Sequence, residues 1–161
     1  MRKFLLGLAF LALALPAEAR NFAVPEKNPA VTLRLPDTWK SEEIEYGFSA
    51  KSPDGDMFFS VESASKKKLD AMLLANKKWM KENEIDDKVK PEEREMDFNG
   101  TAGQVIRYNT TDLNGKTIVD FVILSGGENQ VIMITLWGSE EERAANKADI
   151  AGIMNSVRPI Q

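Results

Sequence analysis

Two segments of this 161-residue chain are apolar at almost every position, and they restrict the fold more than any other feature. Residues 118–124 and 131–137 each contain a single polar residue, Asp120 and Thr135. A strand with one face in water alternates apolar and polar side chains, whereas a strand that is apolar on both faces lies in a sheet covered on both sides. The sequence therefore predicts a central sheet with a covering layer on each face.

The rest of the chain predicts further strands and two helices. Apolar residues three or four apart in residues 66–83 are typical of an amphipathic helix. Ser139 and Glu142 form a capping-box pattern that begins a second helix, and Pro159 lies beyond its end. Strands are predicted at 31–35, 44–51, 57–64, 92–98, 103–111, 116–124 and 131–137. One helix on each face gives an α+β fold, an α/β/α sandwich around an antiparallel sheet of six to seven strands in the order βββ-α-ββββ-α.

The N-terminus has the three parts of a secretory signal peptide. Two cations follow the initial Met, residues 4–15 are apolar, and residues 16–19 provide small side chains at the positions that signal peptidase reads. The apolar run has 12 residues, whereas a membrane-spanning helix needs about 20. We therefore expect residues 1–19 to be cleaved after Ala19, and the mature protein to reach the periplasm or the medium with no membrane span.

The mature chain is predicted to form one domain. Residues 20–29 contain two prolines and little periodicity, which predicts an extended N-terminal arm. Residues 30–161 contain no repeat, no low-complexity tract and no linker that would divide them. A chain of this length can bury enough surface to fold without a disulfide or a structural metal.

The composition removes several kinds of chemistry. The chain contains no Cys and no His, which excludes Cys/His zinc sites, imidazole or thiolate catalysis, disulfide bonds and a lipid anchor on an N-terminal Cys. The net charge of -4 argues against nucleic-acid binding. We expect the dense lysine run at 66–68 to be the solvated start of a helix. No cofactor and no metal is expected.

The best-defined candidate site is a row of polar residues on neighbouring strands. A two-residue turn at Asn114-Gly115 would place Asn109 opposite Asp120. Arg107 would lie on the same face, one diagonal step away and within reach of a long side chain. The turn signal thus predicts an arginine and an asparagine near a carboxylate.

The same row extends to the last strand. A four-residue loop at 126–129 would place Thr135 on the other flank of Asp120. A carboxylate among apolar neighbours costs too much free energy to leave unpaired. The row is therefore either a buried Arg–Asp pair that fixes the strand register or a ligand pocket under a helix edge.

Two further features carry hypotheses of their own. Residues 54–56 (Asp-Gly-Asp) have strong turn chemistry and too few oxygens for a calcium site, so a β-turn is expected. Trp39 follows a turn and is expected to be partly exposed, where it could contact a ligand. Trp79 and Trp137 are expected in the core.

Several sequence elements together resemble the PsbP-like superfamily. They are Leu35-Pro36-Asp37-Thr38-Trp39 after a short strand, the turn Phe98-Asn99-Gly100, the long hairpin after it, and a terminal helix that ends in Asn155-Ser156-Val157-Arg158. The resemblance covers roughly residues 30–159. It implies an antiparallel sheet flanked by helices and a role as a binding or assembly module. It implies no catalytic residues, and the partners of photosynthetic and nuclear members are not carried over.

Three functional hypotheses follow. The first is an exported, non-enzymatic module that binds a protein or small ligand in the cell envelope. The second is a hydrolase that uses Asp120, which requires a solvent-open pocket with a second acid within about 10 Å. The third is a domain that accepts an extended peptide at a sheet edge, for example the edge beside the first strand after Pro29.

Overall fold

The computed structural model describes residues 19–160, so residues 1–18 of the expected signal peptide lie outside the described part of the chain. The strands are β1 (Ala19–Val24), β2 (Val31–Pro36), β3 (Lys40–Ile44), β4 (Gly47–Lys51), β5 (Phe58–Ser65), β6 (Glu92–Phe98), β7 (Thr101–Asp112), β8 (Gly115–Ser125), β9 (Gln130–Gly138) and β10 (Arg158–Pro159). The helices are α1 (Leu69–Glu82), preceded by a short 3-10 turn (Lys66–Lys68), α2 (Glu140–Ala145) and α3 (Lys147–Ser156).

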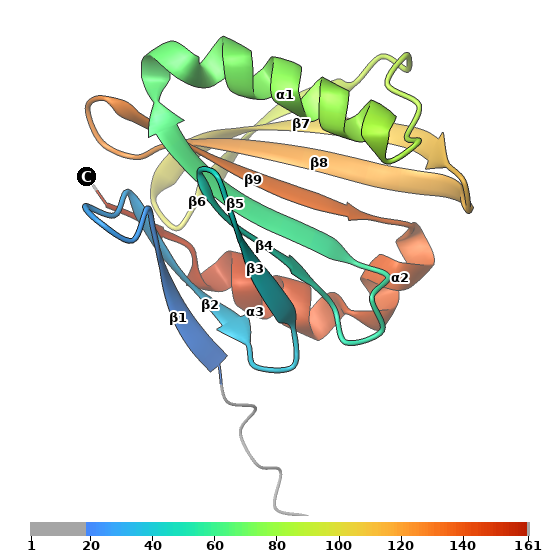
Figure 1. The fold of residues 1–161 in the computed structure, drawn as a ribbon, viewed down its shortest axis with the longest axis horizontal. Coiled ribbons are helices and arrows are strands. Elements are labelled where there is room, and N and C mark those ends of the chain that lie inside the picture. Colours follow the sequence, from blue (N-terminus) through green and yellow to red (C-terminus); the bar gives the residue numbers. More distant parts are fainter. Residues whose placement is uncertain (1–18, 161) are drawn as a thin grey trace, which may run out of the picture.

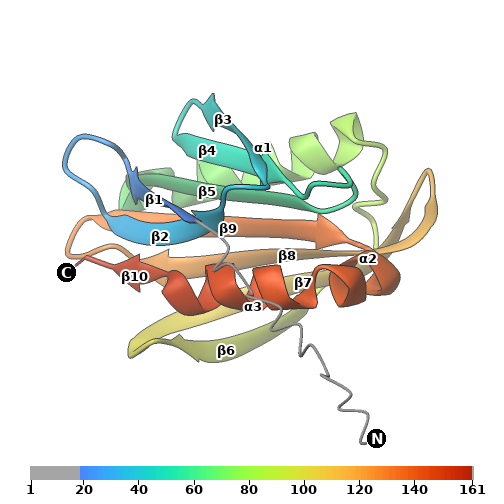
Figure 2. The ribbon, with the colours of Figure 1, turned by 90° about the horizontal axis from the view of Figure 1, so that it is seen from below.

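Seven strands form a central sheet in the order β3-β4-β5-β9-β8-β7-β6, and every neighbouring pair is antiparallel. Helix α1 covers one face of this sheet, and α3 lies with a small sheet of β1, β2 and β10 on the other face (Figures 1 and 2). The predicted α+β sandwich, with a helix on each face of an antiparallel sheet, is confirmed.

The strands β8 and β9 contribute to two separate cores, which explains their two apolar faces. On the α1 side, Phe121 and Met133 are buried together with Met72 and Met80 of the helix. The core on the α3 side includes Val122, Leu124, Ile132, Ile134 and Ile153. Full burial of an apolar side chain of this size stabilises the fold by about 1.5–3 kcal/mol. The apolar run on both strand faces is therefore a direct consequence of the layered structure.

The segment at 44–51, expected as one strand, is part of a hairpin. Strands β3 and β4 pair around a turn at Glu45 and Tyr46, so the prediction of one continuous strand is wrong. Neither residue is a typical turn former, so residue preferences alone do not indicate a turn there. Gly47 follows the turn, and a Cβ at this position would lie 1.9 Å from the carbonyl oxygen of Val61. Only glycine fits where β4 begins to pair with β5.

The C-terminal helix, expected in one piece, is broken at Asn146. The predicted capping box of Ser139 and Glu142 is confirmed at the start of α2. At the break, the backbone N–H and the side-chain amide of Asn146 both donate to the carbonyl oxygen of Glu142, at 3.0 and 3.1 Å. The break separates the short helix α2, which follows β9, from the longer helix α3, which packs on β2. Within residues 19–160, no helix is long and apolar enough to cross a bilayer.

Part of the expected N-terminal arm is a strand. Strand β1 pairs with one edge of β2, and β10 pairs with the other edge. Phe22 of β1 stacks on Phe48 of β4 with ring centroids 4.2 Å apart, which ties the small sheet to the central one. Strand β2 has β1 along one side and the two residues of β10 along part of the other side, so little of this strand is free to pair with a peptide. Peptide binding at another sheet edge stays a prediction.

Candidate functional site

Asp120 lies in the middle of β8 on the α3 side of the sheet, and the residue is 5% exposed. Its partner across the ladder is Arg107 of β7. Nε and Nη2 of Arg107 donate to the two carboxylate oxygens of Asp120 at 2.7 and 2.9 Å. Such bidentate arginine–carboxylate pairs are short, strong and specific in geometry. Asp120 and Arg107 thus form a direct cross-strand pair.

A second arginine, Arg143 of α2, completes the surroundings of Asp120. Its Nη1 donates to Oδ2 of Asp120 at 2.8 Å. Its Nε and Nη2 donate to three backbone carbonyl oxygens, those of Gly138 at 3.0 Å and of Ile118 and Leu136 at 2.9 Å. We refer to Arg107, Asp120 and Arg143 as the Arg–Asp–Arg network. It joins β7, β8, β9 and α2.

The electrostatics of the network keep Asp120 ionised. Burial raises the pKa of the Asp120 carboxyl, but the hydrogen bonds and charges of the two arginines outweigh burial and hold the pKa below its ordinary value of 3.8. Hydrogen bonding to Asp120 raises the pKa of Arg107, whereas burial lowers the pKa of Arg143. Guanidinium groups stay protonated in proteins. A permanently ionised carboxylate of this kind is poorly suited to act as a general acid or base near neutral pH.

No buried polar atom of the network lacks a hydrogen-bond partner. Among the described residues, no buried side-chain nitrogen or oxygen lacks a hydrogen bond. Sequence reasoning missed Arg143, because its contact with Asp120 depends on how α2 turns back over the sheet. The capping box is the sequence signal that points to Arg143, because it fixes the start of α2. Arg143 lies in the first turn, where its backbone N–H donates to the carbonyl oxygen of Ser139 at 3.0 Å.

Asn109 lies on the same face as Asp120 but not at its predicted position. In the β7–β8 ladder Asn109 pairs with Ile118, because the hairpin turn is centred one residue earlier than expected and the register shifts by two residues. Its side-chain amide donates to Glu92 of β6 at 3.0 Å. The predicted pairing of Asn109 with Asp120 is therefore wrong.

Thr135 lies on the opposite face of the sheet from Asp120. It pairs with Phe121 rather than with Asp120, because the loop before β9 separates the paired strands by one residue more than predicted. A register shift of one residue moves a side chain to the other face. Thr135 is buried on the α1 side and does not belong to the network.

Trp39 is 1% exposed, so the prediction of partial exposure is wrong. Its indole Nε1 donates to Asp149 of α3 at 2.9 Å, and its ring belongs to the core on that side of the sheet. A buried indole with a satisfied N–H packs the core and offers no stacking surface. Trp79 and Trp137 pack edge to face, with centroids 5.6 Å apart, against the core on the α1 side.

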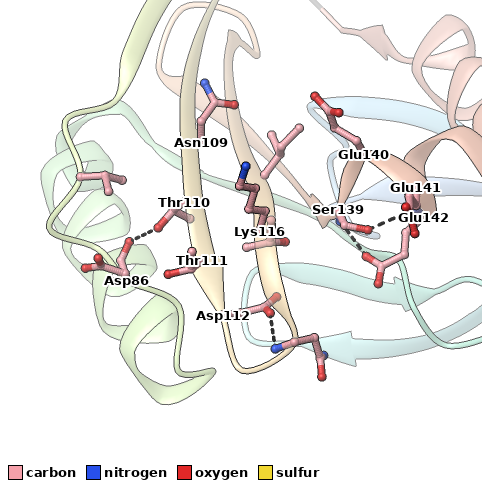
Figure 3. A pocket seen from close by; sticks show the side chains of 14 residues that line it. Asp86, Asn109, Thr110, Thr111, Asp112, Lys116, Ser139, Glu140, Glu141 and Glu142 are labelled. Carbon is pink, nitrogen blue, oxygen red and sulfur yellow. Dashed lines mark hydrogen bonds between the residues drawn. The ribbon is translucent and has the colours of Figure 1, made fainter.

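A cavity of about 840 Å³ lies at the end of the β7–β8 hairpin. Figure 3 shows the loop after α1 on one side of it, the first turn of α2 on the other, and the hairpin strands between them. The charged residues of the lining are Lys116, Asp86, Asp112, Glu140, Glu141 and Glu142. Lys116, Glu140 and Glu141 are exposed. The volume lies in the range of small-ligand sites.

Asp120 does not line this cavity. The hydrolase hypothesis required a solvent-open pocket at Asp120, and a buried carboxylate held by two arginines does not meet that requirement. Residues 54–56 lie in the predicted turn, where Gly55 has a φ of 85° and its N–H donates to the carbonyl oxygen of Ser52 at 2.9 Å. In the described part of the chain, no group of three or more Asp or Glu residues is placed to hold a metal ion.

Comparison with known proteins places this architecture in a class defined by fold. No protein-family model matches the chain, and no curated protein matches it in sequence. Solved structures do share the arrangement of strands and helices, and the class that they define is the PsbP-like fold. This confirms the resemblance found in the sequence at the level of the fold.

The particular structures are distant in sequence. Cyanobacterial PsbP (CyanoP) from Synechocystis superposes with a TM-score of 0.57 at 12% identity, over 94% of this chain and 98% of that protein. A Bacteroides thetaiotaomicron protein gives a TM-score of 0.55 at 9% identity, over 82% of this chain and 46% of that one, so this chain spans about half of its length. A Ran-binding protein from Saccharomyces cerevisiae gives a TM-score of 0.47 at 12% identity, over 90% and 97%.

Proposed function

We propose that this chain is an exported, non-enzymatic module that binds a protein or small ligand of the cell envelope in the cavity beside the β7–β8 hairpin. The observation that carries the proposal is the cavity of about 840 Å³, which is lined by polar groups of the hairpin, of the loop after α1 and of the start of α2. A concave site with several converging polar groups is the usual form of a ligand pocket.

The Arg–Asp–Arg network supports the proposal because it gives the cavity a rigid wall. Ile118 lines the cavity, and its carbonyl oxygen accepts a hydrogen bond from Arg143. Glu142 also lines the cavity, and its carboxylate accepts the backbone N–H of Ser139 at 2.6 Å. Sites on regular elements that are fixed by such supporting bonds are better preorganised than sites on loops.

The charges of the lining indicate the chemistry of the ligand. Five carboxylates and one lysine border the cavity. A ligand group with positive charge or several hydrogen-bond donors complements this surface best. We propose an amine-bearing small molecule or a basic side chain of a partner protein.

Export is part of the proposal and is supported by the signal-peptide pattern of residues 1–19. Cleavage after Ala19 would remove only the first residue of β1 and would leave the other pairs between β1 and β2 in place. A chain without Cys also needs no disulfide to fold in an oxidising compartment.

The ligand can be sought with a thermal-shift panel of polyamines, amino acids and basic peptides, followed by calorimetry. The double variant Glu140→Gln/Glu141→Gln should weaken binding by about tenfold for each charge-assisted hydrogen bond to the ligand that the substitutions remove. Its control, Glu26→Gln/Glu128→Gln, makes the same change in net charge at exposed positions outside the cavity and should keep its affinity. A panel with no binder, or an equal decrease in affinity for both variants, would count against the cavity as the site.

A further inference from the structure

The charge of this acidic protein is strongly segregated. Residues 66–82, which form the 3-10 turn and α1, carry six lysines and two carboxylates. The other described residues carry 13 cations and 22 anions. The helix on one face of the sheet is therefore an excess-positive surface on a molecule that is otherwise strongly negative.

The lysines are arranged around an exposed leucine. We define the outer ridge of α1 as Ala71, Leu74, Lys78 and Lys81 of the helix together with Lys67 of the 3-10 turn before it; these residues are exposed and follow one another every three or four residues. Leu74, at the centre of this ridge, is 71% exposed. Figure 1 shows that α1 lies on the outside of the sandwich, with the sheet on one side of it and no other element on the far side. The ridge is opposite the buried stripe of Met72, Asn76 and Met80.

The ion pairs on the helix leave this surface available to other anions. Lys78 lies 3.3 Å from Glu82, and Lys81 lies 3.5 Å from Asp87. The side chains of Lys78 and Lys81 are 77% and 67% exposed. Ion pairs at this exposure contribute little free energy and exchange readily with other partners.

We propose that the outer ridge of α1 docks on the surface of an anionic phospholipid membrane. Clustered lysines are attracted by the negative surface potential of such a membrane. Long lysine stems can lie along the headgroup region while a central leucine enters it. The five residues lie along one side of the helical segment, so all of them can contact a flat membrane surface at the same time.

The composition of the ridge favours a lipid surface over an acidic protein. Protein–protein interfaces are enriched in Arg and aromatic residues and depleted in Lys. The ridge offers three lysines, one alanine and one leucine, with no aromatic anchor. This inference does not depend on the cavity, which lies at the end of the β7–β8 hairpin and includes no residue of the ridge.

Binding of the mature chain, residues 20–161, to vesicles tests the ridge as a whole, because the apolar run at 4–15 would itself favour a membrane. The wild type should bind vesicles that contain phosphatidylglycerol, bind pure phosphatidylcholine vesicles much more weakly, and dissociate at about 0.5 M salt. The variant Lys67→Gln/Lys78→Gln/Lys81→Gln should bind about 100-fold more weakly, at about fivefold per lysine. The control Lys27→Gln/Lys51→Gln/Lys147→Gln removes the same charge at exposed positions elsewhere and should bind as the wild type does.

A probe at the centre of the ridge reports the contact directly. Because the chain has no Cys, Leu74→Cys can be labelled with an environment-sensitive fluorophore, with Ala148→Cys on the exposed side of α3 as its matched control. Anionic vesicles should shift the emission to the blue at position 74 and leave it unchanged at position 148. No shift at 74, equal shifts at both positions, equal binding by the two triple variants, or capture of an acidic protein without vesicle binding would each overturn the proposal.

Discussion

Asp120 keeps its negative charge in a nearly water-free position because Arg107 and Arg143 donate to both of its carboxylate oxygens. Removing one member of a buried ionic network leaves the others without a partner and is far more damaging than the net contribution of the network suggests. Asp120, which the sequence offers as a candidate reactive group, therefore has a structural role: it binds Arg107 and Arg143.

The first prediction concerns Asp120→Asn. The substitution removes the carboxylate that pairs with the largely buried Arg143 and the partly buried Arg107, so the free energy of unfolding should fall by about 3 kcal/mol. Urea unfolding followed by tryptophan fluorescence measures this change. The exposed turn residue Asp56 supplies a control, because Asp56→Asn should alter the same quantity by less than about 0.5 kcal/mol.

The pH dependence of this difference has a definite sign. The pKa of Asp120 is lowered in the folded protein, so its contribution to stability is complete above the ordinary value of 3.8 and is lost as the pH falls through the folded-state pKa. The gap in unfolding free energy between wild type and Asp120→Asn should therefore be constant near neutral pH and shrink below about pH 3.8. A gap that persists unchanged in strong acid would mean that the pKa of Asp120 is the same in the folded and unfolded states, so that the two arginines do not lower it.

The element α2 shows how a short sequence signal controls a larger arrangement. The capping box fixes the first turn of α2, and that turn carries both Arg143 of the network and three glutamates of the cavity lining. The sequence predicted the cap because the pattern is local. It did not predict the contact between Arg143 and Asp120, which depends on the path of the chain after β9.

Removal of this cap should have a measurable effect. In Ser139→Ala the N–H of Glu142 has no side-chain acceptor, and the free energy of unfolding should fall by about 1 kcal/mol. Ser65 offers a matched control, because it also precedes a helical turn but makes no capping bond with its side chain. Thermal unfolding of both variants should therefore show a clear decrease in stability for Ser139→Ala and almost none for Ser65→Ala. Equal decreases would indicate a general effect of serine removal.

Strand register explains which parts of the candidate site could be predicted. The β7–β8 register is shifted by two residues from the prediction, so Arg107, Asn109 and Asp120 still share a face. The β8–β9 register is shifted by one residue, which places Thr135 on the other face. Turn residues such as Asn-Gly locate a hairpin, but they do not decide which residue is central. A register that is wrong by an even number of residues leaves each side chain on its predicted face. A register that is wrong by an odd number moves it to the other face.

The layers of the whole molecule could be predicted because they depend on hydrophobic pattern rather than register. Strands that are apolar on both faces require cover on both faces. Helix α1 covers one face as predicted, whereas α3 covers the other face together with the small sheet, which contains the strand predicted at 31–35. The part played by residues 19–24 could not be predicted, because β1 pairs with β2 at an edge and carries mostly exposed side chains. The hydrophobic pattern therefore predicts the central sheet and its cover, but it does not predict the strand β1 of the small sheet.

At the scale of the whole molecule, the central claim is that the cavity beside the β7–β8 hairpin binds a component of the cell envelope. Affinity capture from native envelope tests this claim most directly, with wild type, Glu140→Gln/Glu141→Gln and Glu26→Gln/Glu128→Gln as baits. Wild type and the second variant should retain the same partner or ligand, and the cavity variant should fail to retain it. A component retained equally by all three baits, or no retained component at all, would contradict the claim.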